Sequence, residues 1–220
     1  MKHIIKTKEP KVLLDFKNTY KKNHGVDATY NEITHNVKEE LKKNLLKEQY
    51  SICCYCMNSI DESNSHIEHI KPQSQFQTET LDHDNLLVSC NGFWGNKANC
   101  GHNKDNWYDA KEFLTPLDPD CESIFTYSIN GEMDATQNNG KTTIAKLNLN
   151  SHLLVRARKM AITISGLFED DFVRKKQTII DDYSNPNFNK EYHAFCMAVI
   201  YCVNNFGVTE QSQACGGVLG

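Results

Sequence analysis

The chain has no long hydrophobic run, few prolines and a formal charge of only −4. No stretch approaches the roughly 20 apolar residues of a membrane span. Five prolines among 220 residues, with 39% hydrophobic and 24% charged residues, exclude a fibrous or disordered composition. The first residues, MKHIIKTKEP, have lysines, a glutamate and a proline where a secretory signal has an apolar core. We therefore expect a globular protein of the reducing cytosol, with a cytoplasmic location.

Cysteine, by contrast, is abundant. Nine cysteines are many for a cytosolic chain, and their odd number argues against a complete disulfide framework, so a cluster of them is expected to hold a metal. Cys53 and Cys56 have the spacing C-x-x-C, and Cys90 with Cys100 forms a second pair after the central histidines. The two pairs predict a tetrahedral four-cysteine site for structural Zn²⁺ that staples residues 57–89. Cys54 could replace either neighbour as a ligand.

The other cysteines are expected to pack in the core or to lie in the tail: Cys121, Cys196, Cys202 and Cys215.

Apolar spacing divides the chain into segments. Helical patterns run from Pro10 to about Lys22 and from Thr34 to Tyr50, so residues 1–50 are predicted to form an N-terminal helical segment. Residues 51–113 form a compact core, with strands predicted at Ser65 to Ile70 and around Leu86 to Ser89.

A helix is predicted to follow from about Ala98 into Phe113. The dipeptide Asn130-Gly131 indicates a hairpin turn, and beyond Thr142 four further helical patterns predict a C-terminal scaffold over residues 114–206. Residues 207–220 lack periodicity and are expected to be a flexible tail. The fold class predicted is thus α+β and mostly helical, with a small core inserted between helical flanks.

Charge is distributed unevenly. Residues 1–50 carry 11 lysines against 7 acidic residues, whereas residues 51–110 carry 3 lysines against 8 acidic residues. An acidic core is a poor surface for a polyphosphate by itself. If this core acts on nucleic acid, a metal ion, the basic flanks or a partner has to supply positive charge.

The core contains an ordered series of short motifs: C-x-x-C, then Glu68-His69-Ile-Lys-Pro, then Asn85-Leu with Cys90, then Cys100 followed by Gly, His and Asn. This series resembles the HNH endonucleases of the ββα-metal class and covers about residues 53–105. The resemblance implies a zinc-stapled ββα core and hydrolysis of phosphodiester bonds in DNA or RNA.

Hydrolysis of a phosphodiester requires a general base and a cation, and the residues of these motifs can supply both. A histidine with a pKa near 6.5 is suited to deprotonate water, so His69 is predicted to be the general base. Glu68 is predicted to bind a catalytic divalent ion, Mg²⁺ being the first choice for a carboxylate, with His102 completing the site. Asn85 is expected to hold the backbone of the loop that carries His69, and His66 to be a polar neighbour on the strand.

Two departures from the family pattern affect these assignments. Glu68 stands where the family commonly has aspartate, and Gly101 stands where the last histidine commonly follows its cysteine. A shift of one residue rotates a helical side chain by about 100°. Asn103 is therefore a rival to His102 as the metal ligand.

The N-terminal MKHIIKTKEP, the asparagine-rich segment 89–104 and the helical C-terminal half are also similar to the HNH subunit of Septu-type and retron-associated anti-phage systems. That resemblance implies an ABC-type ATPase as partner, and in retron forms a reverse transcriptase with its noncoding RNA.

Two other classes remain open. A non-catalytic zinc-dependent module that binds nucleic acid or protein would keep the four-cysteine site and leave His69 inert. A thiol oxidoreductase would use Cys53 and Cys56, but no βαβ pattern surrounds them.

Overall fold

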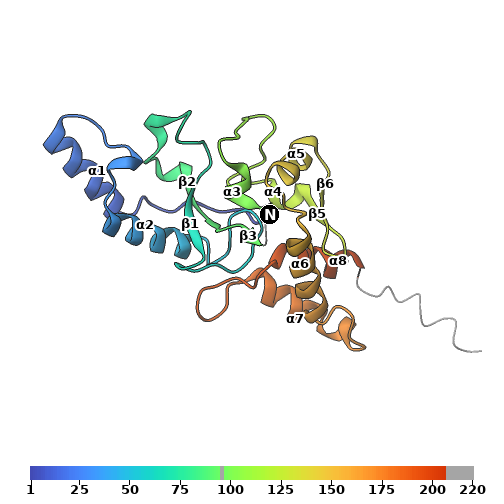
Figure 1. Cartoon of the computed structure of the whole chain (residues 1–220). Coiled ribbons are helices and arrows are strands. Elements are labelled where there is room, and N and C mark those ends of the chain that lie inside the picture. Colours follow the sequence, from blue (N-terminus) through green and yellow to red (C-terminus); the bar gives the residue numbers. More distant parts are fainter. Residues whose placement is uncertain (95–96, 207–220) are drawn as a thin grey trace, which may run out of the picture.

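The computed structural model of the chain describes residues 1–94 and 97–206, and within them it shows an α+β fold (Figure 1). Its helices are α1 (Lys11–His24), α2 (His35–Glu48), α3 (Cys100–Lys104), α4 (Cys121–Ile124), α5 (Asn138–Lys146), α6 (His152–Ile164), α7 (Phe172–Ser184) and α8 (Cys196–Phe206), with 3₁₀ turns η1 (Tyr30–Glu32), η2 (Gln77–Glu79) and η3 (His83–Asn85). Its strands are β1 (Ser65–His69), β2 (Leu86–Cys90), β3 (Phe93–Trp94), β4 (Lys97–Ala98), β5 (Phe125–Tyr127) and β6 (Met133–Ala135).

The predicted N-terminal helices are present. Helix α1 follows Pro10 and ends at Gly25, whose φ of 74° is a left-handed conformation that glycine adopts without strain. Helix α2 buries Leu41, Leu45 and Leu46 and packs against β2. Both helices lie on one side of the β1–β2 hairpin (Figure 1).

Strands β1 and β2 pair antiparallel and form the centre of the predicted core, as expected from their sequences. Ser65 pairs with Cys90 and His69 with Leu86, so the cysteine at the end of β2 and the histidine at the end of β1 lie at opposite ends of the hairpin. Every residue of β2 is buried, because α2 covers one face and α3 approaches the other. The long connection, residues 70–85, returns to the ladder where Ile70 N–H donates to the Asn85 carbonyl at 3.0 Å.

The helix predicted from Ala98 into Phe113 is wrong in its extent. Helix α3 spans only Cys100–Lys104, and Asp105 ends it with a φ of 48°, which no α-helix continues. Turns then lead to Phe113, whose N–H donates to the Asp109 carbonyl. The apolar residues after 104 therefore pack from turns, as in the ring contact between Trp107 and Phe113 with centroids 5.1 Å apart.

The C-terminal segment contains the four predicted helices, but it is not purely helical. A β5–β6 hairpin precedes α5 and turns at Gly131, whose φ is 85°, as the Asn130-Gly131 dipeptide predicts. Buried Arg158 of α6 holds this hairpin by donating to the Gly131 carbonyl at 2.8 Å and to the Leu149 carbonyl at 2.5 Å.

The last helix, α8, begins only at Cys196, later than the apolar pattern from Asn189 suggests. Cys196 and Cys202 of this helix are buried in the core, as is Cys121, which agrees with their predicted packing role. The predicted tail 207–220, with Cys215, lies outside the described residues. Among the described residues, no helix is long and apolar enough to cross a membrane.

Candidate metal centre and hydrolytic site

Four cysteines from three separate segments meet at one end of the β1–β2 hairpin. The sulfur atoms of Cys53, Cys56, Cys90 and Cys100 all lie within 4.8 Å of one another, and all four residues are buried. Cys53 and Cys56 come from the turn that follows α2, Cys90 ends β2, and Cys100 begins α3. This is the set that the sequence predicts, and it could bind a structural metal ion such as zinc.

The distances fit a tetrahedral thiolate site. Zn–S bonds of about 2.3 Å place neighbouring sulfurs of a tetrahedron about 3.8 Å apart, and the sulfurs of Cys56 and Cys90 are 3.9 Å apart. Backbone N–H groups donate to two of the sulfurs, from Cys90 to Cys53 at 3.3 Å and from Asn58 to Cys56 at 3.5 Å. Such donors stabilise sulfur in its thiolate form.

The protonation of the cluster also favours a cation. Burial raises the pKa of Cys53, but contacts with Cys100 and the neighbouring thiols outweigh it and hold that pKa well below the ordinary value. Burial and the Cys53 thiolate raise the pKa of Cys100 well above its ordinary value. Holding several buried thiolates close together requires a positive ion, because their negative charges repel one another.

Cys54 does not belong to the cluster, which settles the ambiguity of the Cys-Cys pair. Its N–H donates to the Val88 carbonyl on β2 at 3.1 Å, and burial raises the pKa of its thiol well above the ordinary value. Cys54 is thus a buried thiol that joins the C-x-x-C turn to the hairpin.

At the other end of the hairpin, β1 and α3 line an open depression of about 240 Å³. The titratable side chains in its lining are His66, Glu68, His69, His102, Lys104 and Asp105. Glu68 and His69 are consecutive and would face opposite sides of a regular strand. They reach the same depression because β1 ends at His69.

His69 has the geometry of a base. Its Nε2 lies 3.0 Å from the Thr80 carbonyl, which can only accept, so Nε2 carries the proton and Nδ1 presents its lone pair as an acceptor. The Gln73 amide approaches Nδ1 at 3.3 Å. Burial lowers the pKa of His69 below its ordinary value of 6.5, so the ring is neutral at neutral pH. Tyr30 packs edge-on against the ring, with centroids 4.7 Å apart.

Glu68 is a buried carboxylate that stays ionised. Burial acts to raise its pKa, but His66 and Lys104 outweigh that effect and lower it. Tyr55 Oη donates to Oε1 at 2.9 Å, and Lys104 Nζ lies 3.0 Å from the same oxygen. Lys104 also donates to the His69 carbonyl at 2.9 Å. The second oxygen, Oε2, faces His66 Nε2 at 3.5 Å.

The side chains of His102 and Asn103 point in different directions from α3. The His102 ring lies beside the His66 ring, with centroids 4.4 Å apart, and His102 lines the depression. The Asn103 amide instead donates to the Lys146 carbonyl of α5 at 2.8 Å. Asn103 therefore points away from Glu68, and the geometry favours His102 over Asn103 as a candidate ligand.

Gly101 explains the altered spacing of this motif. A Cβ at this position would lie 2.4 Å from Glu68 Oε2 and 2.8 Å from His66 Nε2, so any larger residue would displace these two side chains. Glycine directly after Cys100 therefore keeps Glu68 and His66 where they lie, and the histidine comes one position later.

Asn85 holds the loop that follows His69. Its Oδ1 accepts from Lys71 N–H at 2.7 Å, and its Nδ2 donates to the Lys71 and Glu79 carbonyls at 3.1 and 3.0 Å. These are the backbone bonds expected of this amide.

Three side chains that contact Glu68 lie outside the set of catalytic residues predicted from the sequence. His66 is not merely a neighbour on the strand, since it faces Glu68 from the i−2 position on the same strand face. Tyr55 and Lys104 orient the carboxylate from the C-x-x-C turn and from α3. The H-x-E spacing could have indicated His66, whereas no local signal indicates Tyr55.

A divalent ion fits the Oε2 side of this carboxylate chemically, where His66 also lies. One carboxylate oxygen and two imidazoles are donors that first-row metal ions accept, and Mg²⁺ accepts the carboxylate. Among the described residues, however, the four cysteines are the only group of three or more such side chains whose ligand atoms all lie within 4.8 Å of one another. The second group is thus more open than the thiol cluster.

No model of a known protein family matches the chain, and no curated protein matches it significantly.

Proposed function

We propose that the chain is a metal-dependent endonuclease of the HNH type, which hydrolyses phosphodiester bonds in DNA or RNA. The observation that carries the proposal is the pairing of a neutral imidazole, His69, with a buried carboxylate, Glu68, in one open depression. A short helix after two antiparallel strands supplies the remaining groups, as the resemblance implies.

His69 Nδ1 accepts a proton from a water molecule, whose oxygen attacks the phosphorus atom in line with the leaving oxygen. The P–O bond to that oxygen breaks, and the leaving group takes a proton from solvent. The Thr80 carbonyl orients the ring and stabilises the imidazolium that forms. Asn85 keeps the following loop in place.

Glu68 and His102 would hold the catalytic divalent ion, with His66 as an additional nitrogen donor. When bound, Mg²⁺ or a related ion supplies positive charge to the scissile phosphate and to the leaving oxygen. Lys104, which is buried beside Glu68, supplies a fixed positive charge and positions the carboxylate. The four-cysteine cluster would hold a structural zinc ion that fixes β2 and α3 relative to each other.

The acidic core is consistent with a nuclease that a partner delivers to its substrate. We infer an ABC-type ATPase as that partner, in an anti-phage defence complex that in some forms includes a reverse transcriptase and its noncoding RNA. The inference rests on the resemblance of the sequence together with the 3 lysines against 8 acidic residues in segment 51–110.

The test is cleavage of labelled DNA and tRNA with Mg²⁺ or Mn²⁺, with and without an ABC-type ATPase of the proposed partner class. Wild type is compared with His69→Ala and with the control His152→Ala, an exposed histidine of α6. We expect the cleavage rate of His69→Ala to fall by about two to four orders of magnitude, because the general base is removed. The control should cleave at the wild-type rate. Equal cleavage by His69→Ala and wild type would remove His69 as the base.

The second candidate is a zinc-dependent binding module, which the closed four-cysteine cluster favours independently of His69. This module would bind nucleic acid or protein with the same affinity in wild type and His69→Ala, and would cleave nothing with any ion or with the ATPase.

A further inference from the structure

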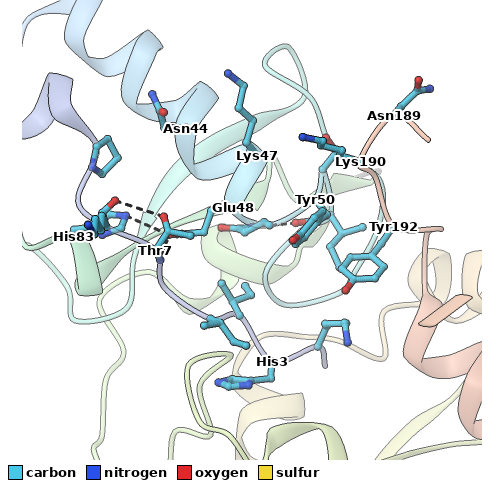
Figure 2. Close-up of a pocket in the computed structure, with 18 of the residues that line it drawn as sticks. His3, Thr7, Asn44, Lys47, Glu48, Tyr50, His83, Asn189, Lys190 and Tyr192 are labelled. Atoms are coloured by element: carbon cyan, nitrogen blue, oxygen red, sulfur yellow. Dashed lines mark hydrogen bonds and ion pairs between the residues drawn. The ribbon is translucent and has the colours of Figure 1, made fainter. Parts of the chain in front are cut away.

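A second cavity, of about 970 Å³, lies between the N-terminal segment, the end of α2 and the loop 189–192 (Figure 2). Among the described residues, none lines both this cavity and the hydrolytic depression. Its volume is at the upper end of the range of small-molecule sites. It is therefore separate from the proposed chemistry.

The cavity has an excess of positive charge. Its two acidic side chains are already neutralised: Glu48 pairs with Lys6 and accepts from Thr7 N–H at 2.7 Å, and Glu122 pairs with Lys2 at 3.0 Å.

Three exposed lysines that line the cavity, Lys8, Lys47 and Lys190, have no ion-pair partner in the described part of the chain. Figure 2 shows Lys47 on α2 and Lys190 on the loop at the same side of the opening. These lysines can meet an anion without breaking an existing pair.

A buried histidine belongs to the wall of the same cavity. His83 is 6% exposed, and its Nε2 faces Glu48 Oε1 at 3.5 Å without making a hydrogen bond. That nitrogen is covered by protein atoms, so His83 is part of the cavity wall and can report on a ligand without contacting it directly.

The wall opposite His83 is aromatic. Tyr50 and Tyr192 pack edge-on with centroids 5.1 Å apart, and the backbone bond from Tyr192 N–H to the Tyr50 carbonyl, 3.0 Å long, fixes the pair (Figure 2). Tyr50 is 37% exposed, so part of its ring is open to a ligand. The face of a tyrosine ring stacks on a nucleobase, whereas the carboxylates of an acidic peptide do not stack on it.

We propose that this cavity binds a nucleotide, with its phosphate on Lys47 and Lys190 and its base against Tyr50. Cationic side chains next to an aromatic ring are the combination that single nucleotides and single strands require. The nucleotide is free or belongs to a single strand, since both present the same chemistry. The site does not depend on the proposed nuclease activity.

The test is calorimetric titration of the full chain, without added divalent ions, with AMP, inorganic pyrophosphate and hexathymidylate. We expect Lys47→Gln/Lys190→Gln to weaken binding of AMP by about 10-fold, as loss of two exposed ion pairs gives. The matched control, Lys22→Gln/Lys159→Gln, changes two exposed lysines away from the cavity and should have no effect. Tyr50→Leu should weaken AMP about 5-fold or more and leave pyrophosphate binding unchanged.

Nitrogen NMR of histidine-labelled protein adds a readout inside the cavity. AMP should shift the His83 signals and leave those of His24, which lies on α1, unmoved. If AMP binds more tightly than hexathymidylate, the ligand of the cavity is a free nucleotide. If hexathymidylate binds more tightly, and Lys47→Gln/Lys190→Gln weakens its binding by the same factor, the ligand is a single strand. Three results would overturn the proposal. They are no binding of AMP or hexathymidylate at millimolar concentration, unchanged AMP binding in the double variant, and displacement of AMP by a polyglutamate peptide as readily as by a nucleotide.

Discussion

The two ends of the β1–β2 hairpin differ in the kind of site they carry. At one end, four chemically identical donors are buried and their sulfur atoms lie within 4.8 Å of one another. Towards the other end, two carboxylates, a lysine and three imidazoles line an open depression, and His102 is exposed. Closed, uniform coordination is typical of structural metal sites, whereas catalytic sites keep an open position. One hairpin thus carries both the candidate structural metal site and the proposed catalytic site.

The short helix α3 links the two ends. Its first residue, Cys100, belongs to the thiol cluster, and its last, Lys104, contacts Glu68. Between them, Gly101 N–H donates to Ser89 Oγ of β2 at 3.1 Å. We therefore expect the position of the charged groups in the depression to depend on the cluster.

The largest effect is expected from removing a thiol ligand. Cys53→Ala should abolish stoichiometric zinc and destabilise the fold by several kcal/mol, because structural zinc contributes roughly 10 kcal/mol or more of binding free energy in small domains. Mass spectrometry for metal content and thermal unfolding measure both quantities.

Cys54→Ala is the matched control, since it removes an equally buried sulfur one position away that is outside the cluster. It should keep one zinc per chain and lose only the packing of one small side chain. Equal loss of zinc in the two variants would contradict the assignment of the ligands.

A smaller effect on stability and a large one on activity are expected from Gly101→Ala. The added Cβ would lie 2.4 Å from Glu68 Oε2 and must displace the carboxylate. Misplacement of a catalytic group by about 1 Å can cost roughly 100-fold in rate, so cleavage should fall by about that factor while zinc content is unchanged.

Gly25→Ala controls for the loss of a glycine, since its φ is 74° and nothing lies within 4 Å of the added Cβ. This variant should lose about 1 kcal/mol of stability from the left-handed backbone and no cleavage activity. If Gly101→Ala cleaves at the wild-type rate, the position of the Glu68 carboxylate does not matter for activity, and its proposed role is wrong.

The smallest predicted effect is on the pH profile. His69 acts as a base only when neutral, and burial lowers its pKa below 6.5. The cleavage rate should therefore rise with pH to a midpoint below 6.5 and be constant at neutral pH. A midpoint above 7 in single-turnover kinetics would mean that another group limits the rate.

Local sequence patterns predict the frame of this molecule well. The C-x-x-C spacing, the apolar β2 segment and the helical repeats of α1 and α2 each depend on residues close in the chain, and the structure has them near the expected bounds. The length of helix α3 was overestimated, because the apolar residues after Lys104 suggest a helix that the backbone of Asp105 ends.

The details of the site depend on contacts that no local pattern contains. The reason for Gly101 is the space that Glu68 and His66 occupy, from a strand more than 30 residues earlier in the chain. Tyr55 reaches Glu68 only because the cysteine turn packs beside β1. The 970 Å³ cavity combines residues from both ends of the chain, so it could not be foreseen.

The central claim is that the thiol cluster supports the fold and that the depression supports cleavage. The most direct test uses one variant, Glu68→Gln, which keeps the shape of the side chain and removes its charge. Zinc content, unfolding temperature and Mg²⁺-dependent or Mn²⁺-dependent cleavage are measured on the same preparation, beside wild type. We predict one zinc per chain, a folded protein and loss of cleavage. Cleavage at the wild-type rate, or loss of zinc together with the fold, would contradict the account.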